Sequence, residues 1–168
     1  MIKLDVSRLK HVPGETQRVV LRSELPDIIT ETERIGLAGP VELDLQLTST
    51  ASAIVVRGEA RAVLLPACGR CLESFAQPVR AEIEETYYQV GQEDVQPDPE
   101  WQPYSGDSID ITGDVIKSLL VALPMRLVCS EDCRGLCPVC GTNLNKQQCN
   151  CVVEEIDPRL AALKKLLQ

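Results

Sequence analysis

Apolar and polar residues alternate in several runs within the first 90 positions of the chain, which is the pattern of a β-strand with one buried face. The runs are 2–6, 17–21, 41–47, 53–65 and 75–90. The last three follow one another through short connections, and this predicts an antiparallel meander. Gly58 interrupts the run at 53–65 and is interpreted as a β-bulge.

The periodicity changes after residue 109, where a helix is predicted over about residues 110–123. Its apolar positions share one face at helical spacing: Val115, Ile116, Leu119, Leu120 and Leu123. Asp110 or Thr112 can cap the start of this helix, and Pro124 favours an end at Leu123. We expect the apolar stripe to belong to the core.

The segment at 91–107 lies between the last predicted strand and the helix, and it holds three prolines and five acidic residues. This composition predicts a mobile acidic loop that is dispensable for folding. Trp101 and Tyr104 are the two residues in it that could attach it to the body.

Two units are therefore predicted, an α+β body at 1–123 and a cysteine-rich module at 124–168. The body is expected to be an antiparallel β-sheet or partly open barrel with one packed helix. The module is expected to form a zinc knuckle followed by a short helix from Arg159 to Leu167, because Asp157 is a good N-cap and Pro158 suits the first helical position.

Six of the eight cysteines fall within 23 residues, at 129–151, and the other two form the pair Cys68 and Cys71. Thiolates at such short spacings are typical of tetrahedral zinc sites. The best set of four is Cys137, Cys140, Cys149 and Cys151, because a Cys-Pro-x-Cys-Gly turn supplies two ligands and the next two thiols complete the site. A second site would take Cys68, Cys71, Cys129 and Cys133, which requires the tip of a hairpin to meet the end of the predicted helix.

Disulfides and plain buried thiols are the alternatives for the cysteine cluster. Disulfides need an oxidising compartment, but the N-terminus has no signal-peptide pattern, and the longest apolar run, 119–125, is too short to span a membrane. We therefore expect a cytoplasmic protein with reduced thiols and no membrane partner. The metal is expected to be structural, because the single histidine, His11, lies more than a hundred positions from the cluster.

Charge and aromatic content bear on the partner. The net charge is −8, and residues 79–114 alone hold one basic and ten acidic residues. Aromatic residues make up only 3%, which disfavours base-stacking platforms. No basic footprint is visible along the sequence, although folding could gather Arg57, Arg61, Arg70, Arg126, Arg134 and Lys146 into a patch.

Several motifs in order resemble the YceD family, the large ribosomal RNA subunit accumulation proteins. They are Cys68-x-Arg-Cys71-Leu72, Ile109-Asp110-Ile111, Leu123-Pro124-Met125, the run from Cys133 to Asn145, and Asp157-Pro158-Arg159-Leu160. The resemblance covers most of 40–168, and no motif is matched at 1–40. It implies a non-enzymatic role in the synthesis, processing or stability of large-subunit ribosomal RNA. The implied partners are the precursor subunit, its RNA or a ribosomal protein, with no small-molecule substrate.

Two other functions remain open. A nuclease would need converging carboxylates, but the available acids fall on an exposed strand face or in loops: Glu82, Glu84, Glu85, Asp107, Asp110 and Asp114. A redox- or zinc-responsive regulator would use the thiols themselves. For the ribosomal role, the contact face is predicted to be the knuckle region, with Arg70, Arg134, Lys146, Asn143 and Asn145; plain turn capping is the alternative for the two asparagines.

Overall fold

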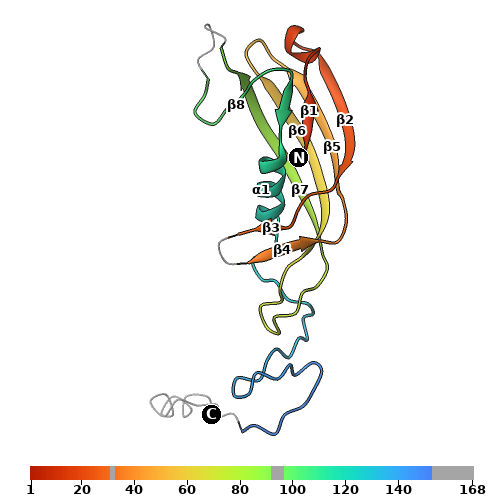
Figure 1. Ribbon diagram of the computed structural model, residues 1–168, viewed down its shortest axis with the longest axis vertical. Helices are drawn as coiled ribbons and strands as arrows, with labels where there is room; N and C mark the ends of the chain where they lie inside the picture. The colour runs from red at the N-terminus through yellow and green to blue at the C-terminus, as the bar shows by residue number, and fades with distance from the viewer. Residues whose placement is uncertain (31–32, 92–96, 153–168) are drawn as a thin grey trace, which may run out of the picture.

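The computed structural model describes residues 1–30, 33–91 and 97–152 of the 168-residue chain (Figure 1). This part contains nine strands, one α-helix and a single 3-10 turn. The strands are β1 (Lys3–Asp5), β2 (Thr16–Ser23), β3 (Ile28–Ile29), β4 (Arg34–Leu37), β5 (Val41–Ser49), β6 (Ile54–Leu65), β7 (Gln77–Gln89), β8 (Gln102–Tyr104) and β9 (Ser108–Asp110). The 3-10 turn is η1 (Leu9–His11), and the helix is α1 (Thr112–Val121).

The predicted meander of β5, β6 and β7 forms the centre of the main sheet. β2 lies antiparallel beside β5, and β4 continues that side of the sheet along the far end of β6, with β3 paired to it. β8 pairs in parallel with the end of β7. The sheet stays open and does not close into a barrel, so the open-sheet form of the prediction is the correct one.

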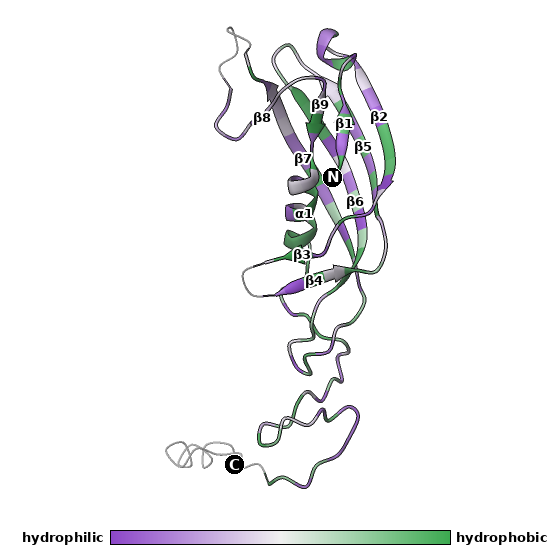
Figure 2. Ribbon diagram, in the orientation of Figure 1, coloured by the Kyte–Doolittle hydropathy of each residue, from purple (hydrophilic) through white to green (hydrophobic). Residues whose placement is uncertain are grey.

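Alternation along the strands puts their apolar residues on one face. β5 is buried at Val41, Leu43, Leu45 and Leu47 and exposed at the residues between them. Figure 2 shows the corresponding change between hydrophobic and hydrophilic residues along β5 and β6. This inner face is covered by α1, by η1 and by the antiparallel pair of β1 and β9, whose buried side chains join the same core.

Helix α1 is fixed to the sheet by its apolar face and by one buried carboxylate. Val115 and Leu119 are fully buried in the core, as predicted. Asp114 accepts hydrogen bonds from the Tyr87 hydroxyl at 2.5 Å and from Gln102 Nε2 at 2.6 Å, which ties the first turn of the helix to β7 and β8. At the start of the helix, the Thr112 hydroxyl accepts a bond from the Ile2 backbone at 2.7 Å, so the N-terminal residues are part of the body.

Gly58 is not a bulge, because the pairing of β6 with both neighbours continues through it without an extra residue. The glycine is required for a different reason. A Cβ at this position would lie 2.1 Å from the backbone oxygen of Asp44 on β5. The close approach of two strands, and not a change of register, explains the residue.

The segment at 91–107 differs from the predicted mobile loop. Gln102–Tyr104 forms β8, and Tyr104 is only 7% exposed and belongs to the core. A three-residue strand that pairs in parallel with a distant segment gives too short a pattern to detect in the sequence. Residues 92–96 and the predicted helix at 159–167 lie outside the described residues.

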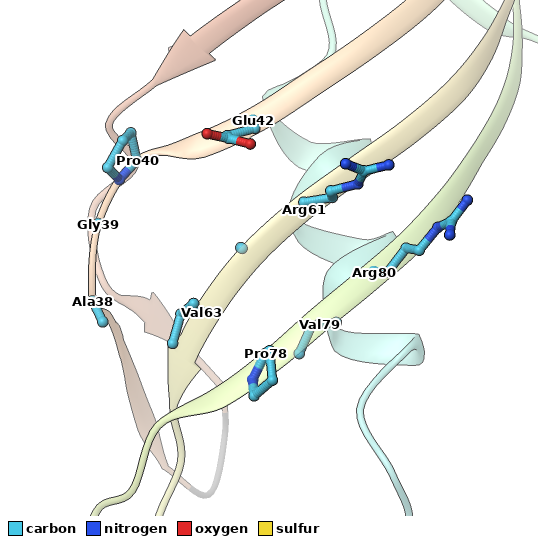
Figure 3. A pocket seen from close by; sticks show the side chains of 10 residues that line it. Ala38, Gly39, Pro40, Glu42, Arg61, Val63, Pro78, Val79 and Arg80 are labelled. Atoms are coloured by element: carbon cyan, nitrogen blue, oxygen red, sulfur yellow. The ribbon is translucent and has the colours of Figure 1, made fainter.

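The outer face of the main sheet carries paired charges. Arginines on β2, β6 and β7 form ion pairs with acids on the same face: Arg18 with Asp44, Arg22 with Glu42, Arg57 with Glu84, and both Arg61 and Arg80 with Glu59. A groove of about 540 Å³ follows at the lower end, lined by Pro40, Val63 and Pro78 (Figure 3). Arg57 and Arg61 thus form ion pairs on the sheet and do not join the cations of the module.

Candidate metal centre

The connection between β6 and β7 folds into a tight turn around Cys68 and Cys71. Leu72 N donates to Cys68 O at 2.9 Å, and Cys68 N donates to Glu73 O at 2.8 Å. Leu72 is the one non-glycine residue with a positive φ, 61°, in the described part of the chain. The turn therefore closes on itself, and the Arg70 N–H within it donates to Cys68 Sγ at 3.4 Å.

The turn around Cys137 and Cys140 repeats this arrangement. Gly141 N donates to Cys137 O at 2.9 Å, and Cys137 N donates to Thr142 O at 2.8 Å. Gly141 has a φ of 72° and occupies the position that Leu72 occupies in the first turn. We call the two turns the first knuckle (residues 68–73) and the second knuckle (residues 137–142). Two Cys-x-x-Cys pairs are evident in the sequence, but their spacing alone does not predict that their backbones match.

The first group of sulfurs, the first site, joins the hairpin tip to the segment that follows α1. Cys68, Cys71, Cys129 and Cys133 place their sulfurs within 4.8 Å of one another. Cys68 Sγ lies 3.9 Å from Cys133 Sγ, and Cys71 Sγ lies 3.7 Å from Cys129 Sγ. A tetrahedron of sulfurs about 2.3 Å from a central Zn²⁺ has edges of roughly 3.8 Å. The spacing fits a shared metal ion and is far too long for a disulfide.

The second group of sulfurs, the second site, lies entirely within the module. Cys137, Cys140, Cys149 and Cys151 also place their sulfurs within 4.8 Å of one another. The structure thus brings together the same two sets of four that the sequence predicted. In Figure 1 the chain leaves the lower end of the sheet at the first site and continues to the second one.

Backbone donors favour negative charge on particular sulfurs. Burial opposes ionisation of Cys68, but N–H groups of Cys129, Cys71 and Arg70 point at its sulfur and lower the pKa of Cys68 to about 6. In the second site, the Thr142 hydroxyl and backbone lower the pKa of Cys140 to about 6.

The pKa values of two neighbouring cysteines, Cys129 and Cys151, are raised instead. The hydrogen bond to the Cys133 sulfur raises the pKa of Cys129 to about 12, and the bond to the Cys140 sulfur raises the pKa of Cys151 to about 12. Four adjacent thiols therefore resist full ionisation on their own. A divalent cation that prefers sulfur removes this conflict, so the donor set fits Zn²⁺ with four thiolate ligands.

Polar side chains around the first site hold its ligands in place. Arg70 Nη1 donates to the backbone oxygens of Glu131 at 2.9 Å and Cys133 at 2.8 Å. Asn145 Nδ2 donates to Cys133 Sγ at 3.3 Å, and Asn145 Oδ1 accepts from Arg134 N at 2.8 Å. Asn145 follows the second knuckle in the chain, so it links the second knuckle to a ligand of the first site.

The five residues predicted as a contact face therefore have different surroundings. Arg70 and Asn145 are used within the module, and Asn143 caps a turn by accepting a bond from Asn145 N at 3.0 Å. Lys146 forms an ion pair with Glu73 and remains exposed. Arg134 is exposed and has no side-chain partner among the described residues. The spacing of cysteines gave no signal for the structural use of Arg70 and Asn145.

The fold and the site define a class of protein: an open antiparallel sheet with one packed helix, whose longest hairpin carries one of two cysteine knuckles. The family described as large ribosomal RNA subunit accumulation protein YceD matches residues 56–167, which run from β6 to the C-terminal segment. The chain belongs to the YceD family. The resemblance to this family that the sequence motifs indicated is thus confirmed.

Individual relatives extend the similarity beyond that range. The chain is 30% identical over 173 residues to the uncharacterized protein Rv2926c of Mycobacterium tuberculosis, covering 98% of this chain and 80% of that protein. It is 27% identical to the uncharacterized protein YlbN of Bacillus subtilis, covering 99% and 97%. A chloroplastic Arabidopsis thaliana protein named large ribosomal RNA subunit accumulation protein YCED homolog 1 is 34% identical over 58 residues, covering 34% of this chain and 18% of that protein. No solved structure matches the chain.

Proposed function

We propose that this protein is a non-enzymatic factor that supports the accumulation of large-subunit ribosomal RNA by binding a precursor of the large subunit. The observation that carries the proposal is the family match, whose name refers to this process. The matched range includes both knuckles, which places the cysteine module inside the part of the chain common to the family.

The surroundings of the acidic residues support a binding role over a nuclease. Glu84 pairs with Arg57, Asp107 pairs with Lys10, and Asp114 holds Tyr87 and Gln102. Asp110 accepts the Thr112 backbone N–H at 3.0 Å. Among the residues that the structure describes, the groups placed to share a metal ion are the two cysteine sets. These carboxylates are committed to separate ion pairs and caps, whereas metal-dependent phosphodiester cleavage needs them to converge.

We propose zinc in both cysteine sites and a structural role for it. A metal held by four thiolates has no open position for substrate, so it would act by fixing the two knuckles. Fixed knuckles would hold the adjoining segments that carry Arg134 and Lys146, and a rigid binding surface lowers the entropy lost on binding. We expect Arg70, Asn143 and Asn145 to contribute indirectly by shaping that surface.

The test is a sucrose-gradient and ribosomal RNA profile of cells that lack the protein. We expect a selective loss of large-subunit RNA, which the wild-type gene restores. Complementation with Arg134→Ala and Lys146→Ala together should restore it poorly. The matched control, Arg18→Ala with Arg22→Ala on the outer face of the sheet, removes two exposed arginines and should restore it fully.

Each variant should first be checked for thermal unfolding and for metal content, so that a folding defect is not mistaken for a binding defect. Full rescue by the Arg134 and Lys146 variant would place the contact face elsewhere. Normal large-subunit RNA in the deletion strain would contradict the proposed function itself.

A redox-responsive role is the second candidate, because Cys129 and Cys140 are exposed while Cys68, Cys71, Cys133 and Cys137 are buried. An oxidant could reach one ligand of each site and release the metal. This role predicts that mild oxidation abolishes association with precursor particles and that a reductant with added Zn²⁺ restores it. Association that is unchanged by oxidation would leave only the first function.

A further inference from the structure

The two ends of β7 differ in how their outer edge is used. At residues 87–89 the strand pairs with β8, but at residues 77–86 no strand in the described part of the chain lies beside it. We call this second stretch the β7 free edge (residues 77–86). It is ten residues long, and a long unpaired edge is a template on which another extended chain can form hydrogen bonds.

Two hydrogen bonds establish which backbone groups point outward from this edge. Val63 O accepts a bond from Ala38 N at 2.9 Å, so the polar groups of Val63 face away from β7. Pro78 is the residue paired with Val63, so the backbone carbonyl of Pro78 must point away from β6. Because the direction of the backbone groups alternates along a strand, the N–H and C=O groups of the other even-numbered residues of β7 also point away from β6. Val90, also even-numbered, donates its N–H to Tyr104 O at 3.0 Å on the outer side, which agrees with this assignment. The free N–H groups are therefore those of Arg80, Glu82, Glu84 and Thr86.

A groove lies between this edge and the helix. It has a volume of about 380 Å³ and is lined by residues of both elements: Arg80, Ala81, Glu82, Lys117, Ser118, Val121 and Ala122. Val121, at the end of α1, is 79% exposed. In Figure 3, α1 lies behind the sheet, on the face opposite the charged arginines and beside β7. A strand edge next to a helix wall offers backbone bonds on one side and side-chain contacts on the other.

The charge of this side of the molecule indicates what the groove would accept. The β7 free edge holds three acidic residues and one basic residue; Arg80 pairs with Glu59, and Glu84 pairs with Arg57. Glu82, in the groove, is exposed and has no ion-pair partner among the described residues. Glu82 and Glu85 on the β7 free edge are thus without ion-pair partners among the described residues, against Lys117 on the helix wall, so the edge strand itself favours a basic partner.

We propose that the β7 free edge and the groove beside α1 bind an extended, lysine- and arginine-rich segment of a large-subunit ribosomal protein, which joins the main sheet as an additional strand. This inference rests on the proposed function and names a partner for it. The cysteine module and this edge would then serve as two separate contact surfaces, one presenting cations and the other accepting them.

The first measurement is site-specific photo-crosslinking with the full-length, metal-loaded protein. A photoreactive residue at Lys117, in the groove, is compared with one at Val20, which is 70% exposed on the β2 edge. The probe is the mixture of proteins extracted with salt from large subunits, with and without purified large-subunit RNA. We expect Lys117 to crosslink to a basic segment of one ribosomal protein and Val20 to give no such product.

The second measurement uses a synthetic peptide with the sequence of the crosslinked segment. Amide hydrogen exchange should slow at Arg80, Glu82 and Glu84 on peptide binding, while Ala81 and Ile83, already bonded to β6, should change little. Glu82→Pro removes one outward N–H without removing a bond to β6, and it should weaken peptide binding at least tenfold. Glu82→Thr keeps that N–H and is the matched control, expected to lose much less.

If Glu82→Pro does not fold, Val121→Trp is the second variant, because it fills the groove from the helix side and should also weaken binding. Crosslinks from Lys117 to RNA alone or to another copy of this chain, or protection spread equally over odd and even residues, would overturn the inference. These outcomes are independent of the deletion strain. Large-subunit RNA that depends on the protein while the groove binds no basic segment would refute this docking site and leave the proposed function intact.

Discussion

The body and the cysteine module hold their shape by different means. Among the described residues, the core of the body contains 24 buried residues, which come from most strands of the sheet, from α1 and from β1 and β9, while β2 adds only partly buried ones. In the part of the chain that the structure describes, the second buried cluster consists of Cys68, Cys71 and Cys133, with Phe75 and Val128 packed against it. Apolar burial can stabilise the first region, but the second has too little of it, so bonds to a metal would have to take its place.

The comparison also gives an order of assembly. The first knuckle is carried by the β6–β7 hairpin, so folding of the body already positions two of the four ligands of the first site. All four ligands of the second site come from residues 137–151, which contain no helix or strand. We therefore expect the first site to bind metal more tightly than the second.

Metal removal should produce the largest difference between the two regions. Structural zinc sites contribute on the order of 10–16 kcal/mol of apparent binding free energy in small domains. Elemental analysis should give two zinc ions per chain, and a strong chelator should abolish amide protection over residues 135–147 while β5, β6 and β7 remain protected. A metal-free protein with a fully protected module would contradict the assignment.

Acid should have the same effect as the chelator. Cys68 and Cys140 have pKa values lowered to about 6. A lowered pKa means that the thiolate stabilises the folded module above the unfolded pKa, and that this stabilisation is lost as the pH falls through the folded value. Protons compete with the metal for the thiolates of each site, so we expect acid to release the metal, followed with a metal-binding dye, while the body is still folded. Unfolding of the body at a higher pH than metal release would contradict this expectation.

Deletion of a core side chain tests the other side of the comparison. Leu47 is fully buried on β5, so Leu47→Ala should lower the free energy of unfolding of the body by about 2–5 kcal/mol. The second site should keep its metal affinity, since none of its ligands lies on the sheet. The control is Val20→Ala on the exposed side of β2, which should change the urea midpoint very little.

The same contrast explains how far the sequence could predict this structure. β5, β6 and β7 follow from alternation over long runs, and α1 follows from its apolar stripe. β3, β4, β8 and β9 have four residues or fewer, and their pairings join segments that give no local signal. Grouping the cysteines needed only their order and spacing, whereas the roles of Arg70 and Asn145 depend on backbone groups that come together only in three dimensions.

The link between the two sites can be tested through Asn145. Because its amide holds the Cys133 sulfur, Asn145→Ala should weaken metal binding at the first site by about 10–100-fold, the usual effect of losing a partner around a metal ligand. Competition with a chelator measures the affinity, and Co²⁺ absorption reports the geometry of the thiolates. Asn150→Ala, at an exposed position between two ligands of the second site, is the control. Equal losses of first-site metal affinity in the two variants would contradict a link between the second knuckle and the first site.

The smallest effect should come from the residue with a positive φ in each knuckle. Leu72 has a φ of 61° where the second knuckle has Gly141, and a leucine in this conformation costs about 1–2 kcal/mol. Leu72→Gly should therefore stabilise the first knuckle, by about 1 kcal/mol or less, because the greater freedom of glycine in the unfolded chain offsets part of the gain. Gly141→Leu should destabilise the second knuckle in turn.

Leu72 is also 66% exposed, so its strain is not balanced by burial. If Leu72→Gly binds metal at least as tightly as the wild type but fails to restore large-subunit RNA, the exposed leucine is part of the contact face. If it restores the RNA fully, the side chain has no such role, and the strain is a cost of the turn alone.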